Sequence, residues 1–154
     1  MQKKLKNKGF TIIEVLIVLA IIAVMMLAVF LAVPALNRNS RNNSIESDAQ
    51  KILGAVGDFR GANNGANPQG IASDAAGLLT VTGTGLNTVE NRVRGSTTVA
   101  AGTGPTAPGT IHFAIGRKCN SATAFGTSAN TRSVAIMYLT ETGATSTAQH
   151  CVDS

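Results

Sequence analysis

The chain has 154 residues, a formal net charge of +5 and hydrophobic side chains at 44% of its positions. That length fits one domain, or an extended element joined to a small domain. Four of its 13 basic residues lie in the first nine positions, and the remainder holds nine basic and eight acidic side chains. This nearly neutral remainder has no basic cluster interleaved with aromatic residues, so the composition gives no direct evidence for nucleic-acid binding.

The first nine residues form a basic leader, which the positive-inside rule would hold on the cytoplasmic side of a membrane. Its lysines are Lys3, Lys4, Lys6 and Lys8. Residues 10–33 follow as a run in which only Thr11 and Glu14 are not apolar. As a helix this run would be about 36 Å long, which is enough to cross a bilayer. A carboxylate in hydrocarbon is costly, so Glu14 needs an explanation.

Three interpretations of this segment compete. A secretory signal peptide has an apolar core of about 7–15 residues, shorter than this run, although a cut could be drawn after Ala35. A plain membrane anchor fits the length and the lysines but leaves Glu14 unexplained. In the third interpretation, cleavage between Gly9 and Phe10 creates an amine four residues before Glu14, and a buried carboxylate needs such a cation.

Residues 9–14 read Gly-Phe-Thr-Ile-Ile-Glu, and with the apolar run behind them they resemble the class III signal sequence of type IV pilins. The resemblance favours the third interpretation. It implies that a membrane prepilin peptidase cleaves after Gly9 and methylates the new amine of Phe10. It also implies that the pilus assembly machinery extracts the subunit into a homopolymer, in which Glu14 pairs with the Phe10 amine of an adjacent subunit. Pairing of Glu14 with its own amine is the alternative.

Pro34 follows the apolar run and predicts a bend, because its missing amide proton leaves the carbonyl of Phe30 without a helical partner. Residues 35–44 are rich in asparagine, a poor helix former, and are expected to be the weakest part of a continuous helix. Arg38 and Arg41 in this stretch read as parts of a solvated helical turn, with lipid head groups or acids of a neighbour as the other possibility.

The next stretch has apolar residues at helical spacing, which predicts a one-sided stripe packed against a globular head. The stripe consists of Ile45, Ala49, Ile52, Leu53, Val56 and Phe59. Asp48 and Lys51 are three residues apart on another face and predict a minor supporting pair. Gly61 and the Asn-Asn-Gly sequence at 63–65 are helix-ending signals. We therefore expect one long helix over residues 10–61.

Residues 62–154 alternate between turn-rich and strand-like segments, which predicts a β-rich head. The expected strands are residues 78–81, 87–94, 110–116, 133–140 and 148–152, with loops at 62–76 and 95–109. A helix followed by antiparallel strands predicts an α+β fold, in which the long helix packs on a small antiparallel sheet. The pilin family has the same layout, with a disulfide that encloses the segment before the last strand.

Cys119 and Cys151 are the two cysteines, and an even count beyond an export segment indicates an oxidising compartment and one disulfide. Closing a loop of about 33 residues would contribute roughly 3–4 kcal/mol in the chain-entropy model. Two buried free thiols are the alternative. A metal site is a less favoured alternative still, because His150 is the only residue of a metal-ligating type that neighbours the cysteines.

Catalytic motifs are missing from the sequence, so we expect neither an enzyme nor a cofactor or metal. His112 and His150 are the only histidines, and we expect both to face solvent from strands. No Ser or Cys lies in a recognisable nucleophile motif with a base partner. The Gly-Thr-Gly sequences at 83–85 and 102–104 lack the third glycine of a nucleotide fingerprint and read as turns.

The pilin resemblance implies a single-pass membrane precursor that becomes the major subunit of an extracellular type IV pilus, a fibre that serves adhesion, twitching motility or DNA uptake. The related alternative is a minor pilin or a type II secretion pseudopilin, although pseudopilins usually lack the Cys119/Cys151 pair. The alternative of another class is a monomeric, membrane-anchored extracellular binding module, which would keep the leader lysines and form no filaments.

Overall fold

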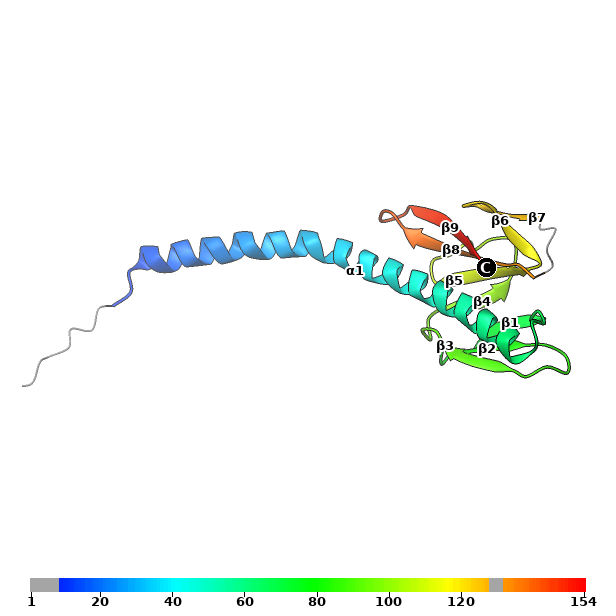
Figure 1. Ribbon diagram of the computed structural model, residues 1–154. Helices are drawn as coiled ribbons and strands as arrows, with labels where there is room; N and C mark the ends of the chain where they lie inside the picture. The colour runs from blue at the N-terminus through cyan, green and yellow to red at the C-terminus, as the bar shows by residue number, and fades with distance from the viewer. Residues whose placement is uncertain (1–8, 128–131) are drawn as a thin grey trace, which may run out of the picture. The chain divides into compact units, whose positions relative to one another are not determined.

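The computed structural model describes residues 9–127 and 132–154 (Figure 1). The chain divides into two compact units. The first ends at Asn37, and the second runs from Arg38 to Ser154. The described residues form one helix and nine strands, an α+β fold as predicted. The four leader lysines lie outside the described residues. The division into leader, helix and head therefore stays a prediction.

Helix α1 runs from Ile12 to Ala62. Pro34 lies inside it, and the bend expected at this residue stays a prediction. The helix ends where Asn64 and Gly65 adopt left-handed backbone angles, with φ of 53° and 81°. These angles let the Gly65 amide donate back to the carbonyl of Arg60 at 2.7 Å. The Asn-Asn-Gly sequence predicts this ending, because asparagine and glycine tolerate the left-handed region.

Two sheets and a hairpin make up the rest of the second unit, and Figure 1 shows the C-terminal half of α1 lying along both sheets. The three-stranded antiparallel sheet has the order β1-β2-β3, with bounds Gly70–Ser73, Leu78–Thr82 and Val89–Arg92. The four-stranded sheet has the order β4-β5-β8-β9, with bounds Thr98–Ala101, Thr110–Ile115, Val134–Glu141 and Thr147–Asp153. The hairpin pairs β6 (Arg117–Ser121) with β7 (Ala124–Thr127).

The core lies between the second half of α1 and the inner faces of the two sheets. The helix contributes the predicted stripe, of which Leu53 is half-buried and the rest are buried. The sheets contribute alternate residues, among them Leu79, Val81, Ile111, Phe113, Ile136 and Tyr138. The predicted stripe is therefore confirmed as the helix face that holds the head.

The strands that the sequence pattern missed are β1, β4, β6 and β7. Strand β1 reads Gly-Ile-Ala-Ser and β4 reads Thr-Val-Ala-Ala, so each offers one large apolar side chain and no repeated alternation. Strand β6 is mostly charged or polar. The pairing of β4 with β5 is parallel, in contrast to the antiparallel arrangement expected for the sheet, and residues 102–109 form the crossover that a parallel pair requires.

Candidate assembly site

Thr11 and Glu14 form a capping box at the start of α1. The Glu14 carboxylate oxygen Oε2 accepts hydrogen bonds from the Thr11 amide at 3.0 Å and from its hydroxyl at 2.9 Å. The Glu14 amide donates in return to Thr11 Oγ1 at 3.4 Å. Reciprocal bonds of this kind satisfy amides that have no partner inside the helix. The Thr-x-x-Glu spacing carried this signal, and our reading of the sequence missed it.

Gly9 and Phe10 lie just before this capping box. Phe10 is 87% exposed, and an added Cβ on Gly9 would meet no atom within 4 Å among the described residues beyond its chain neighbours. In the uncleaved chain the Phe10 nitrogen is a peptide amide and carries no charge. The predicted pair between Glu14 and the Phe10 amine therefore stays a prediction for the processed chain.

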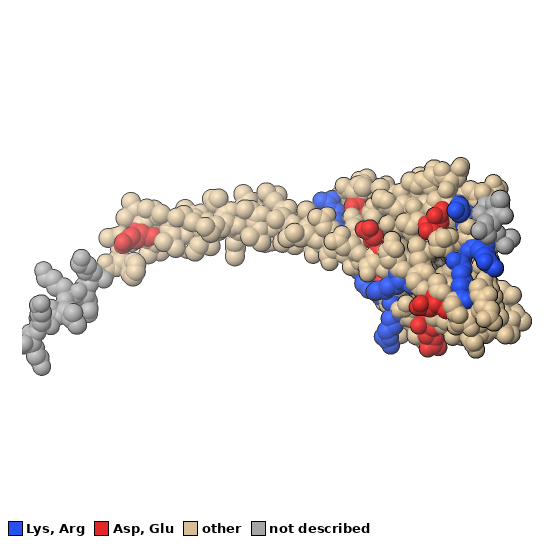
Figure 2. All heavy atoms as spheres, viewed as in Figure 1, with Lys and Arg blue, Asp and Glu red and all other residues tan. Residues whose placement is uncertain are grey.

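The apolar run of the first unit, residues 10–33, is exposed along its whole length. Its large side chains range in exposed fraction from 43% at Val33 to 87% at Phe10. Figure 2 shows this surface as uncharged apart from one acidic group near its N-terminal end. Mean hydropathy reaches 3.3 in its most apolar window, and α1 is the helix within the described residues that is long and apolar enough to cross a membrane. A surface this large and apolar needs lipid or other apolar helices against it.

The predicted disulfide is confirmed. Cys119 on β6 is bonded to Cys151 on β9, with their Cα atoms 5.8 Å apart. The Cys119 amide also donates to Asp153 Oδ2 at 2.8 Å. Together these contacts fasten the polar β6–β7 hairpin to the edge of the four-stranded sheet.

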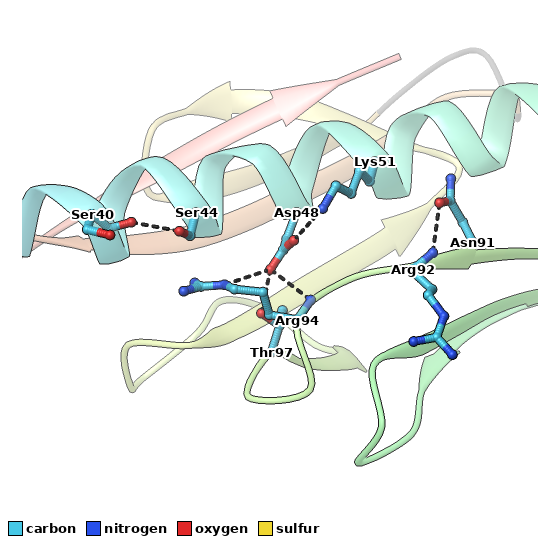
Figure 3. Close-up of polar contacts among 8 residues, drawn as sticks. All are labelled: Ser40, Ser44, Asp48, Lys51, Asn91, Arg92, Arg94 and Thr97. Carbon is cyan, nitrogen blue, oxygen red and sulfur yellow. Dashed lines mark hydrogen bonds and ion pairs between the residues drawn. The ribbon is translucent and has the colours of Figure 1, made fainter.

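Asp48 is a buried acid on the core-facing side of α1 (Figure 3). It is 1% exposed and accepts hydrogen bonds from Thr97 Oγ1 at 2.7 Å, from the Arg94 amide at 3.3 Å and from Lys51 Nζ at 3.2 Å. The pair with Lys51 exists as predicted, but its placement on a separate, minor face was wrong. Asp48 ties the helix to the turn that links the two sheets.

The surroundings of Asp48 act on its pKa in opposite directions. Burial raises the pKa, but the bonds from Thr97, the Arg94 amide and Lys51 favour the carboxylate, and the net result lies below the ordinary value. The carboxylate is thus the form that the folded second unit prefers.

Arg41 and Asn42 bind the end of β8. Arg41 Nε donates to Glu141 Oε1 at 2.8 Å, and its Nη2 contacts Oε2 of the same carboxylate. Asn42 exchanges two hydrogen bonds with the backbone of Glu141, at 2.9 and 2.8 Å. The bonds from Arg41 lower the pKa of Glu141. Arg41 is therefore engaged within its own chain, in contrast to the solvated turn that we expected.

The two histidines have packing roles in place of the solvent-facing positions that we predicted. His112 Nδ1 accepts a hydrogen bond from the Gly104 amide at 3.3 Å. His150 stacks on Tyr138 with ring centroids 5.3 Å apart, and its Nε2 lies 2.8 Å from Thr140 Oγ1. Both are half-buried. Within residues 9–127 and 132–154 no group of three or more His, Cys, Asp or Glu side chains is arranged to hold a metal ion.

Comparison with known protein families identifies a sequence motif at the N-terminal end of the chain. A family model described as the prokaryotic N-terminal methylation motif matches residues 4–30, which include Gly9, Phe10 and Glu14. No curated protein and no solved structure matches the chain in these comparisons.

The methylation motif, the long helix and the β-sheet head together define a type IV pilin/pseudopilin-like protein. Pilin-family proteins are structural and are not enzymes. The class III signal implies processing by a prepilin peptidase, and with the apolar helix it indicates a membrane precursor and a later location in a pilus or pseudopilus.

Proposed function

We propose that the chain is the major structural subunit of a type IV pilus. The observation that carries this proposal is the exposed apolar helix of the first unit, most of which lies within the methylation motif. Such a helix is tolerated in lipid and in a bundle of like helices, because both surroundings are apolar. The precursor would therefore wait in the membrane and then pack its helix into a filament core, with the heads on the outside.

The roles of Gly9, Phe10 and Glu14 belong to this proposal. Cleavage after Gly9 turns the Phe10 nitrogen into an amine, and Glu14 of a neighbouring subunit pairs with it and sets the axial register. Before cleavage, the two donors of Thr11 already bond one oxygen of the Glu14 carboxylate. This capping arrangement supports the proposal because it explains how the precursor can keep an acid at the start of an apolar helix.

The disulfide supports a pilin over a pseudopilin, since pseudopilins usually lack the cysteine pair that joins β6 to β9 here. A minor pilin would share every feature described so far and would differ in abundance. A monomeric anchored binding module would keep its leader and would be missing from surface fibres.

The deciding experiment is negative-stain microscopy of the fraction sheared from the cell surface, together with N-terminal sequencing of the shed protein. We expect abundant fibres whose main component begins at a methylated Phe10. Traces of this chain in fibres built mainly from another protein would indicate a minor pilin. Protein that stays in the membrane and still begins at Met1 would contradict the proposal.

A further inference from the structure

A groove lies on the outer face of the four-stranded sheet, opposite the face that packs against α1. His112 and Ala114 occupy the outer side of β5, because they alternate with Ile111 and Phe113 of the core. The groove, called the outer groove below, has a volume of about 310 Å³, near the lower end of the range for small-molecule sites. Its lining consists of Gly102, Thr103, Ala114, Arg117, Thr123, Ala124 and Phe125.

One wall of the outer groove is the start of the β4–β5 crossover. The Gly102 amide donates to the carbonyl of Phe113 at 3.4 Å, and the Gly104 amide donates to His112 Nδ1 at 3.3 Å. A side chain at position 102 would place its Cβ only 2.4 Å from His112 Nδ1, so glycine allows the wall to approach this closely. These contacts hold the wall in position without a ligand.

The opposite wall is the β6–β7 hairpin. The disulfide from Cys119 to Cys151 and the bond from the Cys119 amide to Asp153 fasten this hairpin to β9. Both walls are thus fixed before any ligand arrives, which lowers the entropy that binding must overcome.

Arg117 supplies an unused positive charge to the outer groove. Within the residues that the structure describes, its guanidinium makes no hydrogen bond or ion pair, whereas Arg41 and Arg94 are paired with acids. Residues 128–131, close by in sequence, contain no acid that could serve as a partner. The charge is therefore available to a ligand.

The register of the hairpin places the aromatic ring beside this charge. Arg117 pairs with Thr127 and Cys119 pairs with Phe125, so the side chains of Arg117 and Phe125 leave the same face of the hairpin. Lys118 leaves the opposite face, because neighbouring residues in a strand alternate. The outer groove thus combines one cation, one half-buried aromatic ring and the hydroxyls of Thr103 and Thr123.

We propose that the outer groove binds an acidic sugar, that is, one sugar ring that bears a carboxylate. Arg117 matches a carboxylate through two parallel hydrogen bonds. The threonine hydroxyls can donate to and accept from ring hydroxyls. The Phe125 ring covers the apolar C–H face of the sugar. A neutral sugar would leave Arg117 unpaired, and a simple carboxylate such as acetate would leave Phe125 without a contact.

This binding activity belongs to the second unit and does not depend on filament assembly. The test uses the purified full chain in detergent micelles, titrated with D-glucuronate, D-glucose or acetate and followed by ligand-observed NMR. We expect millimolar binding of glucuronate and at least about tenfold weaker binding of glucose and acetate. Arg117→Gln should weaken glucuronate binding about tenfold or more, because it removes a charged hydrogen-bond donor.

Lys118→Gln is the matched control, since it removes the same charge from the opposite face of the same strand. We expect it to change the affinity for glucuronate by less than about twofold. Arg117 is exposed, so its replacement should leave the fold intact, and an unchanged thermal unfolding midpoint checks this. Equal losses in the two variants, equal binding of glucose or acetate, or no glucuronate binding up to about 50 mM would each overturn the proposal.

Discussion

Glu14 is the residue on which assembly is expected to depend most strongly. We expect Glu14→Ala to leave cleavage and membrane insertion intact and to abolish filaments, because truncating one partner of a buried ion pair costs about 3–5 kcal/mol. Intact-mass analysis measures cleavage, and negative-stain counts measure filaments. Thr11→Val is the matched control: it removes the capping hydroxyl, costs about 0.5–2 kcal/mol of helix stability and leaves the carboxylate in place. Pili of normal number and length from Glu14→Ala would exclude the register role.

Gly9 is expected to matter to the peptidase and to have little effect on the fold. Among the described residues beyond its chain neighbours, no atom lies within 4 Å of the position that a Cβ on Gly9 would take. Gly9→Val should therefore block processing while the second unit folds normally, and the intact mass should retain the leader. Asn7→Val adds the same side chain two residues earlier and should be processed. A normal mature N-terminus in Gly9→Val would refute the assignment of the cleavage site.

Asp48 makes the free energy of unfolding of the second unit depend on pH in the acid range. Because its folded pKa lies below the ordinary value, its stabilising contribution is complete above about pH 4 and is lost as the pH falls through the folded pKa. Asp48→Asn should lower the free energy of unfolding at pH 7 by about 1–3 kcal/mol, because it weakens several buried hydrogen bonds. The difference from the wild type should shrink at lower pH.

Urea unfolding at pH 7 and pH 3, followed by circular dichroism, tests this dependence. Asp58→Asn is the control, because Asp58 is an exposed acid on the same helix, and we expect a change within about 0.5 kcal/mol. An Asp48→Asn penalty that is as large at pH 3 as at pH 7 would show that the charge on Asp48 is unimportant.

At the scale of elements, α1 contains exposed glycines that its own fold does not need. Apart from the backbone of α1 itself, an added Cβ at Gly54, Gly57 or Gly61 would meet no described atom within 4 Å, and none of the three has a positive φ. Because glycine in a helix interior is about 1 kcal/mol less favourable than alanine, Gly54→Ala should raise the free energy of unfolding of the second unit by up to about 1 kcal/mol.

Gly65→Ala is the contrasting variant, since its φ of +81° is a conformation that alanine avoids. We expect it to lower the free energy of unfolding, and chemical denaturation of both variants measures the two changes. Destabilisation by Gly54→Ala would mean that the helix surface at this residue is covered in the protein as it occurs in solution.

The elements that sequence reasoning predicted well are those with long periodic patterns. The stripe from Ile45 to Phe59 has helical spacing, and Ile111, Phe113 and Ile115 alternate along β5. Strands β1, β4, β6 and β7 lack such patterns, because each has only four or five residues and few large apolar side chains. The role of Asp48 was open to prediction, since it lies three residues after Ile45 and four before Ile52, on the apolar face.

At the scale of the whole molecule, the two units place different demands on their surroundings. The second unit buries its own core, whereas the apolar side chains of the first unit are exposed. The apolar run and the basic leader predicted this difference between an exposed apolar helix and a head with its own core. The outer groove was not predictable, because one wall comes from a crossover that we expected to be a loop and the other from a short hairpin for which the sequence pattern predicts no strands.

The disulfide should stabilise the second unit without being required for its core. The core cluster contains neither cysteine, so Cys119→Ser/Cys151→Ser should still fold. Its free energy of unfolding should fall by roughly 3–4 kcal/mol, because the unfolded chain regains the entropy of an open loop. Amide hydrogen exchange should rise mainly in β6 and β7, since their other fastening to β9 is the bond to Asp153. Equally faster exchange throughout β5 and β8 would show that the disulfide supports the entire sheet.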